Sequence, residues 1–304
     1  MYDLIIIGAG PAGLAAALYA TRKRLNYLVL SRDLGGKTNY SVAIPEREDD
    51  QTIRADELVT IYRSRLEYLR HSYRLTGVKR LDIGDHFSVE TDDGSTLESR
   101  SVIVASGTHM KKLDVPGEME FLSRALGYSS ISYSHLFARK RVFVAGDTNR
   151  VLGSALELSI HAQHVTVGLL AGGRFDEALV SRLSSLENVE VLSDTTIREF
   201  SGDEFARTVE VEANGSKRTI EADGFFVEPE PRPNTSFLPA DVSLAAGGFI
   251  EVNGSNMTSV PGLFAAGDVT GNGYEQVLVS LGEGAKAVLS AYRYLLENGL
   301  ENRD

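Results

Sequence analysis

The sequence has 304 residues, 42% of them hydrophobic and 24% charged, which is typical of a globular protein of about two domains. Its 31 basic and 42 acidic residues give a net charge of −11, which argues against binding to nucleic acid or to an anionic membrane. No apolar run approaches the roughly 18 residues of a membrane span, and no basic segment precedes the first apolar run, so we expect no signal peptide. Cysteine is absent, which excludes disulfides and a dithiol of the chain's own. We therefore expect a cytoplasmic protein.

The first 30 residues have the pattern of a strand, a glycine-rich turn, a helix and a second strand. A β-branched run at 4–7 leads into Gly-Ala-Gly-Pro-Ala-Gly at 8–13, an alanine-rich helical stretch at 14–25 and an apolar run at 27–30. In this context G-x-G-x-x-G is the fingerprint of dinucleotide binding. Gly8 permits the tight turn, Gly10 lets the backbone approach a pyrophosphate, and Gly13 lets the helix pack on the sheet, with the helix N-terminus facing the phosphates.

The acidic residue that commonly binds the ribose, about 20 residues after the fingerprint, is missing. Ser31 stands at the end of the second predicted strand, with Arg32 and Asp33 behind it. A serine hydroxyl can bond a ribose, but it does not accept as a carboxylate does. The ribose contact is therefore the least specific part of the predicted site.

The chain continues with a second glycine-rich loop at 34–38 and a helical pattern at 54–73. Between 54 and 80, seven basic residues face three acidic ones, a local charge of +4 in an acidic protein. Such a run is usually a solvated face, and the alternative is a docking face for an acidic partner. A hairpin is predicted at 87–94, and a buried strand at 101–107 runs into a small-residue turn.

A second βαβ pattern follows, with a strand at 141–146, a helix from about 152 to 161 and a strand at 165–167. Hairpin-like strands fill 189–227, and three alternating prolines in 228–233 suit an interdomain linker. A short strand at 262–268 and a helix through 296 complete the chain. The sequence thus predicts an α/β protein with two nested Rossmann-like domains of the three-layer ββα kind.

At this point the sequence resembles the thioredoxin-reductase-like family of two-domain FAD flavoproteins. The resemblance rests on 8–13, Gly35-Gly36, 105–107, Pro233-Asn234-Thr235 and 260–269, in matching order along nearly the whole chain. It implies an FAD-binding domain made of 1–112 and 240–304, an inserted, degenerate NAD(P)-binding-like domain at 113–239, and a homodimer.

The resemblance also implies which residues bind FAD. Asp268 is expected at the ribityl chain and Gln276 near the isoalloxazine ring, where the N-terminus of the last helix favours the negative charge of a reduced flavin. The full expected set is Gly8, Gly10, Pro11, Ala12, Gly13, Ser31, Arg32, Gly36, Lys37, Thr38, Val78, Ala105, Ser106, Gly107, Gly267, Asp268, Val269 and Gln276.

Other positions depart from the family pattern. The redox-active C-x-x-C falls on Ser129 to Ser132, and the family's acidic neighbour falls on Tyr133. A serine pair cannot form a disulfide, and a tyrosine with a pKa near 10 is a poor general acid at neutral pH, so no confident catalytic residue remains.

The nucleotide fingerprint of the inserted domain is damaged as well. It reads Gly-Asp-Thr-Asn-Arg-Val at 146–151, with threonine in place of the glycine that admits a pyrophosphate. The expected basic cluster for a 2′-phosphate falls on Leu-Leu-Ala at 169–171. We therefore expect a protein that does not depend on NADPH; the alternative is that Arg150 and Arg174 compensate in part for the missing cluster.

One possible metal site was considered. Glu157, His161 and His164 have the spacing of one helix face and could bind zinc, but no fourth ligand is near in the sequence. We expect no metal.

Three functions follow from these observations. The first is an NADPH-independent, FAD-dependent electron-transfer enzyme whose donor is an acidic carrier such as ferredoxin or flavodoxin. The second is an NAD(P)H-dependent flavin reductase or a ferredoxin–NADP reductase-like enzyme, since such enzymes also lack the cysteine pair. The third is a non-catalytic FAD-binding or regulatory protein.

Overall fold

The computed structural model describes residues 1–40, 42–43, 55–69 and 72–300, and it contains two compact units. The first unit consists of Met1–Asn39, Thr52–His109 and Arg232–Asp304, and the second of Tyr40–Gln51 and Met110–Pro231. The predicted domains, 1–112 with 240–304 and 113–239, end a few residues away from these junctions and remain a proposal.

The first unit is built on a sheet with the strand order β3-β2-β1-β6-β5-β4, and β16 also pairs with β6. The pairs β1–β2, β2–β3, β1–β6 and β16–β6 are parallel. The pairs β5–β6 and β4–β5 are antiparallel. The strands are β1 (Tyr2–Ile7), β2 (Tyr27–Ser31), β3 (Tyr73–Leu75), β4 (Val78–Ile83), β5 (Phe87–Thr91), β6 (Thr96–Val104) and β16 (Leu263–Ala265). A separate two-stranded pair joins β7 (Thr108–His109) to β15 (Arg232–Pro233).

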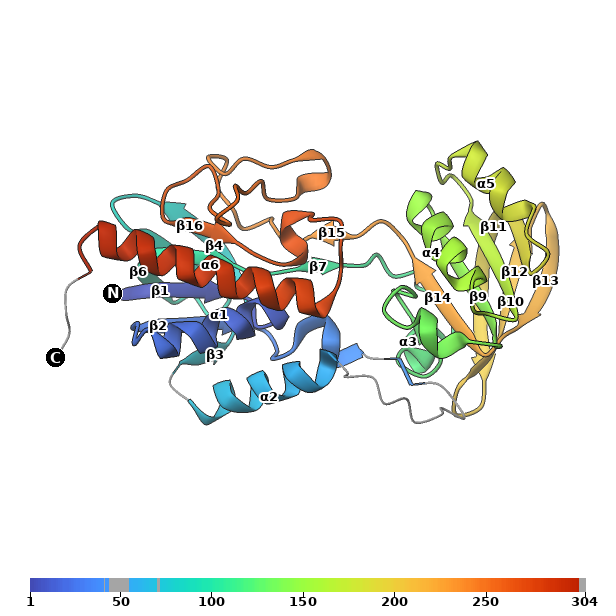
Figure 1. Ribbon diagram of the computed structural model, residues 1–304, viewed down its shortest axis with the longest axis horizontal. Coiled ribbons are helices and arrows are strands. Elements are labelled where there is room, and N and C mark those ends of the chain that lie inside the picture. Colours follow the sequence, from blue (N-terminus) through green and yellow to red (C-terminus); the bar gives the residue numbers. More distant parts are fainter. Residues whose placement is uncertain (41, 44–54, 70–71, 301–304) are drawn as a thin grey trace. The chain divides into compact units, whose positions relative to one another are not determined.

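Helices cover one face of this sheet (Figure 1). They are α1 (Pro11–Arg22), α2 (Ala55–Tyr68) and α6 (Val277–Glu297). Alternate residues of β1 explain the layering, because Leu4 and Ile6 pack with the helices whereas Ile5 and Ile7 pack with the hairpin side. Short 3₁₀ helices lie in the loops, η1 (Gly36–Tyr40), η3 (Ala246–Gly248) and η4 (Asp268–Thr270).

The second unit has a sheet of order β13-β12-β11-β10-β9-β14-β8. Its strands are β8 (Leu126–Gly127), β9 (Arg141–Gly146), β10 (His164–Leu170), β11 (Val189–Gly202), β12 (Ala206–Ala213), β13 (Ser216–Glu221) and β14 (Gly224–Glu228). Its helices are α3 (Glu118–Phe121), α4 (Asn149–Ser159) and α5 (Glu177–Ser184), with a 3₁₀ turn, η2 (Ser134–Phe137). Each sheet has a parallel part flanked by helices and an antiparallel part, and this α/β arrangement confirms the predicted fold class.

Two carboxylates organise loops away from the sheets. Buried Glu118 accepts hydrogen bonds from the backbone N–H groups of Leu113 and Asp114 and from the Tyr128 hydroxyl. Burial, and next the negative charge of Glu118, raise the pKa of Tyr128. In the β5–β6 turn, the Thr91 hydroxyl and the Ser95 N–H donate to Asp93 and lower the pKa of that carboxyl to about 2.

Two sequence expectations need correction. The helix expected from about 152 to 161 runs from Asn149 to Ser159, so His161 lies beyond it and His164 begins β10. Glu228, expected in a proline linker, is the last residue of β14 and is fully buried. Among the described residues, no helix is both long and apolar enough to cross a bilayer.

Candidate functional site: a glycine-rich sheet edge and a buried carboxylate

Three strands of the first unit end at the same edge of the sheet. Ile7 of β1 pairs with Val104 of β6, and Val104 pairs with Ala265 of β16. Because the strands are parallel, the loops that begin at Gly8, Ala105 and Ala266 meet at their carboxyl ends, where open α/β sheets bind their ligands.

The fingerprint glycines have distinct structural reasons. Gly8 has a φ of +106°, and a Cβ there would lie 2.2 Å from the Ala105 carbonyl oxygen. A Cβ on Gly13 would lie 1.9 Å from the Gly8 oxygen, so helix and turn touch directly. At Gly10 the nearest atom to an added Cβ is the Gly35 oxygen, 4.0 Å away. Packing within the chain explains Gly8 and Gly13, whereas Gly10 borders open space.

The N-terminus of α1 faces that space. Gly10 is its N-cap residue, Pro11 is its first residue, and no side chain of the described residues caps it. Unpaired backbone N–H groups and the positive end of the helix dipole favour a phosphate there. Pro11 and Ala12 thus lie where the sequence placed them, in the first turn.

The ribose end of the predicted site contains Ser31, Arg32 and Val78. The Ser31 hydroxyl accepts a hydrogen bond of 3.1 Å from the Ala9 N–H, which leaves its own O–H to donate. Arg32 is largely exposed and pairs with Asp92 at 2.9 Å, and Val78 is the half-buried first residue of β4. Ser31 therefore lies beside the glycine-rich turn at 8–13, and Arg32 forms an ion pair with Asp92.

The second glycine loop packs against the first. A Cβ on Gly36 would lie 3.2 Å from the Gly10 Cα, and the Thr38 hydroxyl donates to the Gly35 carbonyl. This close approach places Lys37, the next residue, at the rim of the cradle, which is the site formed by the loops that begin at Gly8, Ala105 and Ala266.

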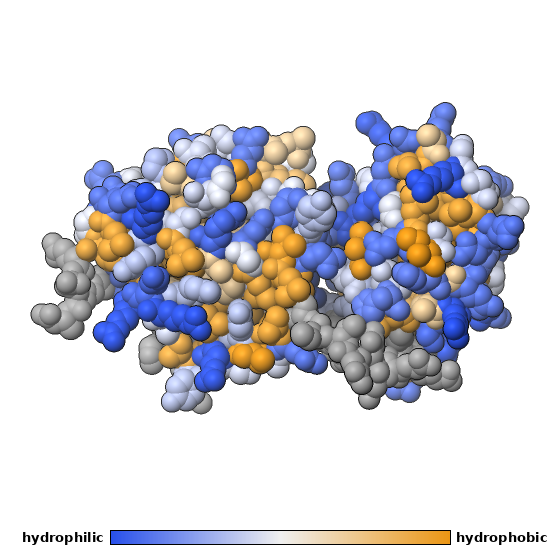
Figure 2. Space-filling view, in the orientation of Figure 1, coloured by the Kyte–Doolittle hydropathy of each residue, from blue (hydrophilic) through white to orange (hydrophobic). Residues whose placement is uncertain are grey.

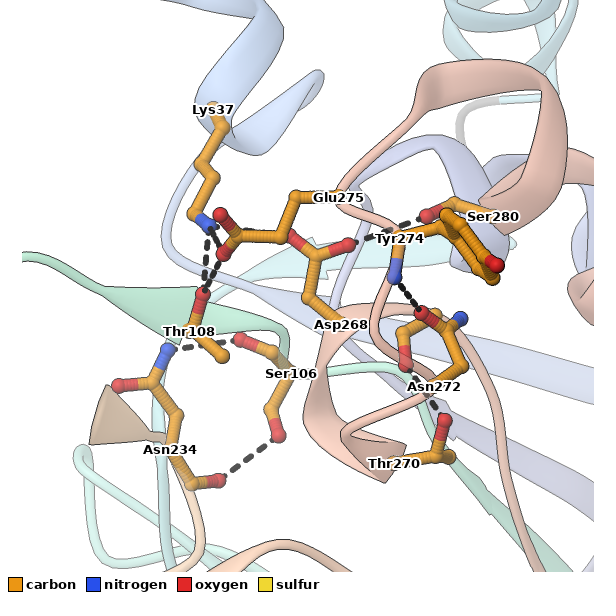
Figure 3. A network of polar contacts seen from close by, with 11 residues as sticks. Lys37, Ser106, Thr108, Asn234, Asp268, Thr270, Asn272, Tyr274, Glu275 and Ser280 are labelled. Atoms are coloured by element: carbon orange, nitrogen blue, oxygen red, sulfur yellow. Dashed lines mark hydrogen bonds and ion pairs between the residues drawn. The ribbon is translucent and has the colours of Figure 1, made fainter. Parts of the chain in front are cut away.

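Lys37 reaches into a cluster of charged and hydroxyl side chains (Figure 3). Its Nζ lies 2.7 Å from Glu275 Oε1 and 3.0 Å from Asp268 Oδ2, and it donates to the Thr108 hydroxyl. Thr108 donates in turn to Glu275 Oε1 at 3.1 Å, and Ser280 donates to Asp268 Oδ1 at 3.2 Å. One ammonium thus faces two carboxylates at the predicted flavin end of the site.

A side-chain amide fixes the loop after β6. Asn234 donates from Nδ2 to the Ser106 carbonyl at 2.8 Å, and its N–H donates to the Gly107 carbonyl at 3.0 Å. The Ser106 hydroxyl donates back to the Asn234 carbonyl at 2.7 Å (Figure 3). The predicted site residues Ala105 to Gly107 are therefore held as a rigid loop.

A carboxylate of α6 fixes the segment that precedes this helix. Glu283 accepts from the Gly267 N–H at 2.6 Å and from Asn272 Nδ2 at 2.9 Å. Val269 is fully buried, and Gln276 is the N-cap residue of α6. Gln276 therefore lies at the positive end of a 21-residue helix, as the resemblance requires.

The second unit contains the serines that stand at the family's cysteine positions. Ser129 and Ser132 are half-buried, and Ser130 between them is fully buried. The Tyr133 ring stacks on Phe226 with centroids 6.5 Å apart. Ser130 and Tyr133 therefore have structural contacts, and the chain contains no cysteine.

A buried carboxylate lies at the carboxyl end of β14, beside α4. Glu228 accepts from the Ser130 N–H at 2.6 Å, from the Ser130 hydroxyl at 2.7 Å and from the Ser154 hydroxyl at 2.5 Å. Arg150, in the first turn of α4, has its Nε 3.8 Å from Glu228 Oε2. The Glu228 carboxylate thus lies beside the Arg150 and Ser154 side chains of α4.

The degenerate fingerprint is closely packed. A Cβ on Gly146 would lie 2.5 Å from the Glu228 carbonyl oxygen and 2.9 Å from Val151 Cβ. Asp147 Oδ1 accepts from the Glu230 N–H at 3.0 Å, which adds a second carboxylate at this edge. Two carboxylates, Glu228 and Asp147, and one guanidinium, that of Arg150, thus lie at this edge.

Glu157, His161 and His164, whose spacing in the sequence suits zinc, do not form a group of metal ligands in the described part of the chain. Glu157 accepts a hydrogen bond from the Ser134 hydroxyl at 2.7 Å, and no group of three potential metal ligands occurs among the described residues. The helix that was to align them ends before His161.

The first unit thus has the architecture of a dinucleotide-binding flavoprotein domain. The sequence pattern of the pyridine nucleotide-disulphide oxidoreductase family matches residues 2–284. The chain belongs to this family, whose thioredoxin-reductase-like members are FAD-binding flavoproteins.

Known proteins match nearly all of the chain. "NADH dehydrogenase" of Bacillus subtilis (strain 168) is 34% identical over 98% of the chain, which spans 59% of that relative's length. Thioredoxin reductase from Streptococcus pyogenes MGAS5005 superposes with a TM-score of 0.87 at 29% identity, covering 98% of this chain and 99% of that one. A ferredoxin-flavin thioredoxin reductase from Clostridium acetobutylicum has a TM-score of 0.50 at 28% identity, with 97% and 98% covered.

The first unit fits FAD. Open space at Gly10, the uncapped N-terminus of α1 and the Asp268 loop lie at one edge of the sheet, as the pyrophosphate and ribityl chain require. When bound, FAD supplies the capacity to accept and release electrons, and the chain's residues bind and orient it.

Sequence reasoning missed several residues of the site. Thr108, Glu275, Glu283 and Ser154 were not singled out, whereas Glu228 was noted only as an added acid in place of a small turn of the family. Glu275 had a local signal, because it directly precedes the expected flavin residue Gln276. The others are joined only by contacts between distant segments, such as the 74 residues that separate Ser154 from Glu228.

Proposed function

We propose that this protein is an FAD-dependent electron-transfer enzyme that takes its electrons from a carrier protein and does not use NADPH. The observation that carries the proposal is buried Glu228, whose carboxylate lies beside the first turn of α4 and is bonded by Ser130 and Ser154. Arg150 lies 3.8 Å from this carboxylate and offsets part of its charge, whereas Asp147 adds a second carboxylate that opposes a pyrophosphate by like-charge repulsion. The lack of cysteine further requires that the acceptor meet the flavin directly.

An electron-carrier protein is the donor that this proposal favours. A relative with 28% identity is described as a ferredoxin-flavin thioredoxin reductase, which supports ferredoxin as the class of donor. Carriers of this kind are acidic, and the basic stretch 54–80, whose usual interpretation is a solvated face, is the alternative docking face. Three of its side chains, Arg63, Lys79 and Arg80, are already paired with carboxylates, and Arg54 and Arg70 lie outside the described residues. Docking there therefore rests chiefly on Arg65 and Arg74.

The test is anaerobic reduction of the FAD-loaded protein, followed at the visible flavin band. We expect reduced ferredoxin or flavodoxin to bleach the band and NADPH to leave it unchanged, while a thioredoxin reductase bleached by NADPH serves as the positive control. Substitution of Arg65 and Arg74 by glutamine is expected to slow reduction by the carrier and to weaken its salt dependence. Bleaching by NADPH within seconds would overturn the proposal.

A second candidate is an NADH-dependent enzyme. The 34% identical relative described as an NADH dehydrogenase favours it, and NADH lacks the 2′-phosphate, for which the segment 169–171 offers no basic side chain. Rapid bleaching by NADH but not by NADPH would select this candidate. A protein that takes up FAD but is reduced by neither nicotinamide nor carrier would select the non-catalytic alternative.

We also propose a homodimer, which the resemblance implies. Apolar side chains gather over the amino-terminal half of α6 (Figure 2), where Leu278 is 61% and Val279 37% exposed. Sedimentation of the parent protein and of Leu278→Ser tests this, and the proposal expects a dimer that the variant weakens. A monomeric parent protein refutes it.

A further inference from the structure

The charged cluster at the flavin end of the cradle contains one carboxylate, that of Glu275, which was not expected in the site. Asp268 was expected at the ribityl chain, but Glu275 was not expected in the site, and the Lys37 ammonium lies between the two carboxylates. The side chains of Asp268 and Glu275 are only 14% and 17% exposed, so solvent screens their charges incompletely.

The cluster is fixed in place by several independent contacts. Gly36 packs against Gly10 and positions Lys37, while buried Thr108 donates to Glu275. On the other side, Ser280 of α6 holds Asp268. Three separate segments of the first unit therefore converge on the Lys37 ammonium (Figure 3).

We propose that Lys37 and Glu275 are an opposed pair of charges that sets the reduction potential of the bound flavin. Reduction of the flavin by two electrons with uptake of one proton adds one negative charge at the ring. A neighbouring cation favours that charge and a neighbouring anion disfavours it. With one ammonium and two carboxylates, the cluster has one net negative charge, so Lys37 offsets part of an otherwise strongly anionic site.

The pair has opposite signs, and this yields a test that a merely structural role does not pass. Lys37→Gln removes the cation, so the equilibrium constant for reduction is expected to fall about tenfold, which is about 30 mV more negative for a two-electron couple. Glu275→Gln removes an anion and is expected to raise the constant by about the same factor. The double variant is expected to lie near the parent, because the pair itself is neutral.

The measurement is spectroelectrochemical titration of the FAD-loaded protein, with dithionite as the reductant and a redox dye of known potential. Lys37→Arg keeps the charge and is expected to stay within about threefold of the parent. Arg293→Gln is the matched control. It breaks the Arg293–Glu297 ion pair of 2.9 Å on the same helix, about 25 Å along α6 from Gln276.

The proposal depends on FAD binding and not on the identity of the electron donor, so it can fail while the proposed function stands. If Lys37→Gln retains too little FAD, the sign of the Glu275→Gln shift decides alone. Shifts of the same sign in both variants, or a Glu275→Gln potential no more positive than that of Arg293→Gln, would overturn it.

Discussion

Replacing Ser154 by alanine removes one of the donors that make the burial of the Glu228 carboxylate tolerable. The Ser154 hydroxyl bonds Glu228 Oε2 at 2.5 Å, and both residues are fully buried, so water cannot replace the lost donor. A hydrogen bond to a charged group contributes roughly 1.5–3 kcal/mol, and its loss at a buried acceptor is expected at the upper part of that range. We therefore expect Ser154→Ala to lower the free energy of unfolding of the second unit by about 2–3 kcal/mol.

The assay is urea unfolding followed by far-ultraviolet circular dichroism, with flavin fluorescence reporting separately on the first unit. Ser159→Ala is the matched control on the same helix, because its hydroxyl bonds only the Leu156 carbonyl. We expect that control to change stability by less than about 0.5 kcal/mol. Equal stability of the two variants would refute the view that Glu228 is a buried charge dependent on its serine donors.

Three further predictions concern the cradle and two titrating groups. Gly10→Ala is expected to fold normally, since the nearest atom to its Cβ is 4.0 Å away, but to weaken FAD binding at least tenfold by filling the space before the helix N-terminus; unchanged FAD affinity in a fluorescence titration would contradict this. The pKa of Tyr128 is raised by burial and next by Glu118, so its neutral form contributes stability below pH 10 that is lost as the pH rises further. Tyr128→Phe should flatten the alkaline limb of a stability profile, and an unchanged limb would count against it. The lowered pKa of Asp93, about 2, means that its ionised form contributes stability above pH 4 that is lost as the pH falls toward 2; a carboxyl titration by NMR with a midpoint near 4 would refute this.

Local patterns were sufficient to predict the cradle. The G-x-G-x-x-G turn, the strand before it and the helix after it are contiguous, so Gly8 and Gly13 could be assigned packing roles that the structure bears out. The nesting of one βαβ pattern inside the other followed from the strands and glycine turns read along the chain, whereas the order of the strands was not predicted. The fold class was therefore predictable from spacing and glycine placement.

The contacts between distant segments could not be predicted. Glu228 stands in a run of acids and prolines that looks like a solvent-exposed linker, and only its donors, 74 and 98 residues away, show it to be buried. The Lys37–Glu275 pair spans 238 residues, and a sequence does not show which carboxylate a lysine selects. The predicted helix ends at about 161, beyond the observed end at Ser159, because the sequence has no stop signal before His161.

The anchoring of Ser130 bears on any attempt to engineer disulfide chemistry into this scaffold. Cysteines grafted at 129 and 132 would flank a residue whose N–H and hydroxyl are both bound to Glu228. A redox-active dithiol must form and break its disulfide and reach a partner, whereas the centre of this turn is held by two hydrogen bonds to Glu228. Cysteines at these two positions would therefore not suffice for disulfide exchange, and the first substitution to make is one that removes the hydrogen bonds between Ser130 and Glu228.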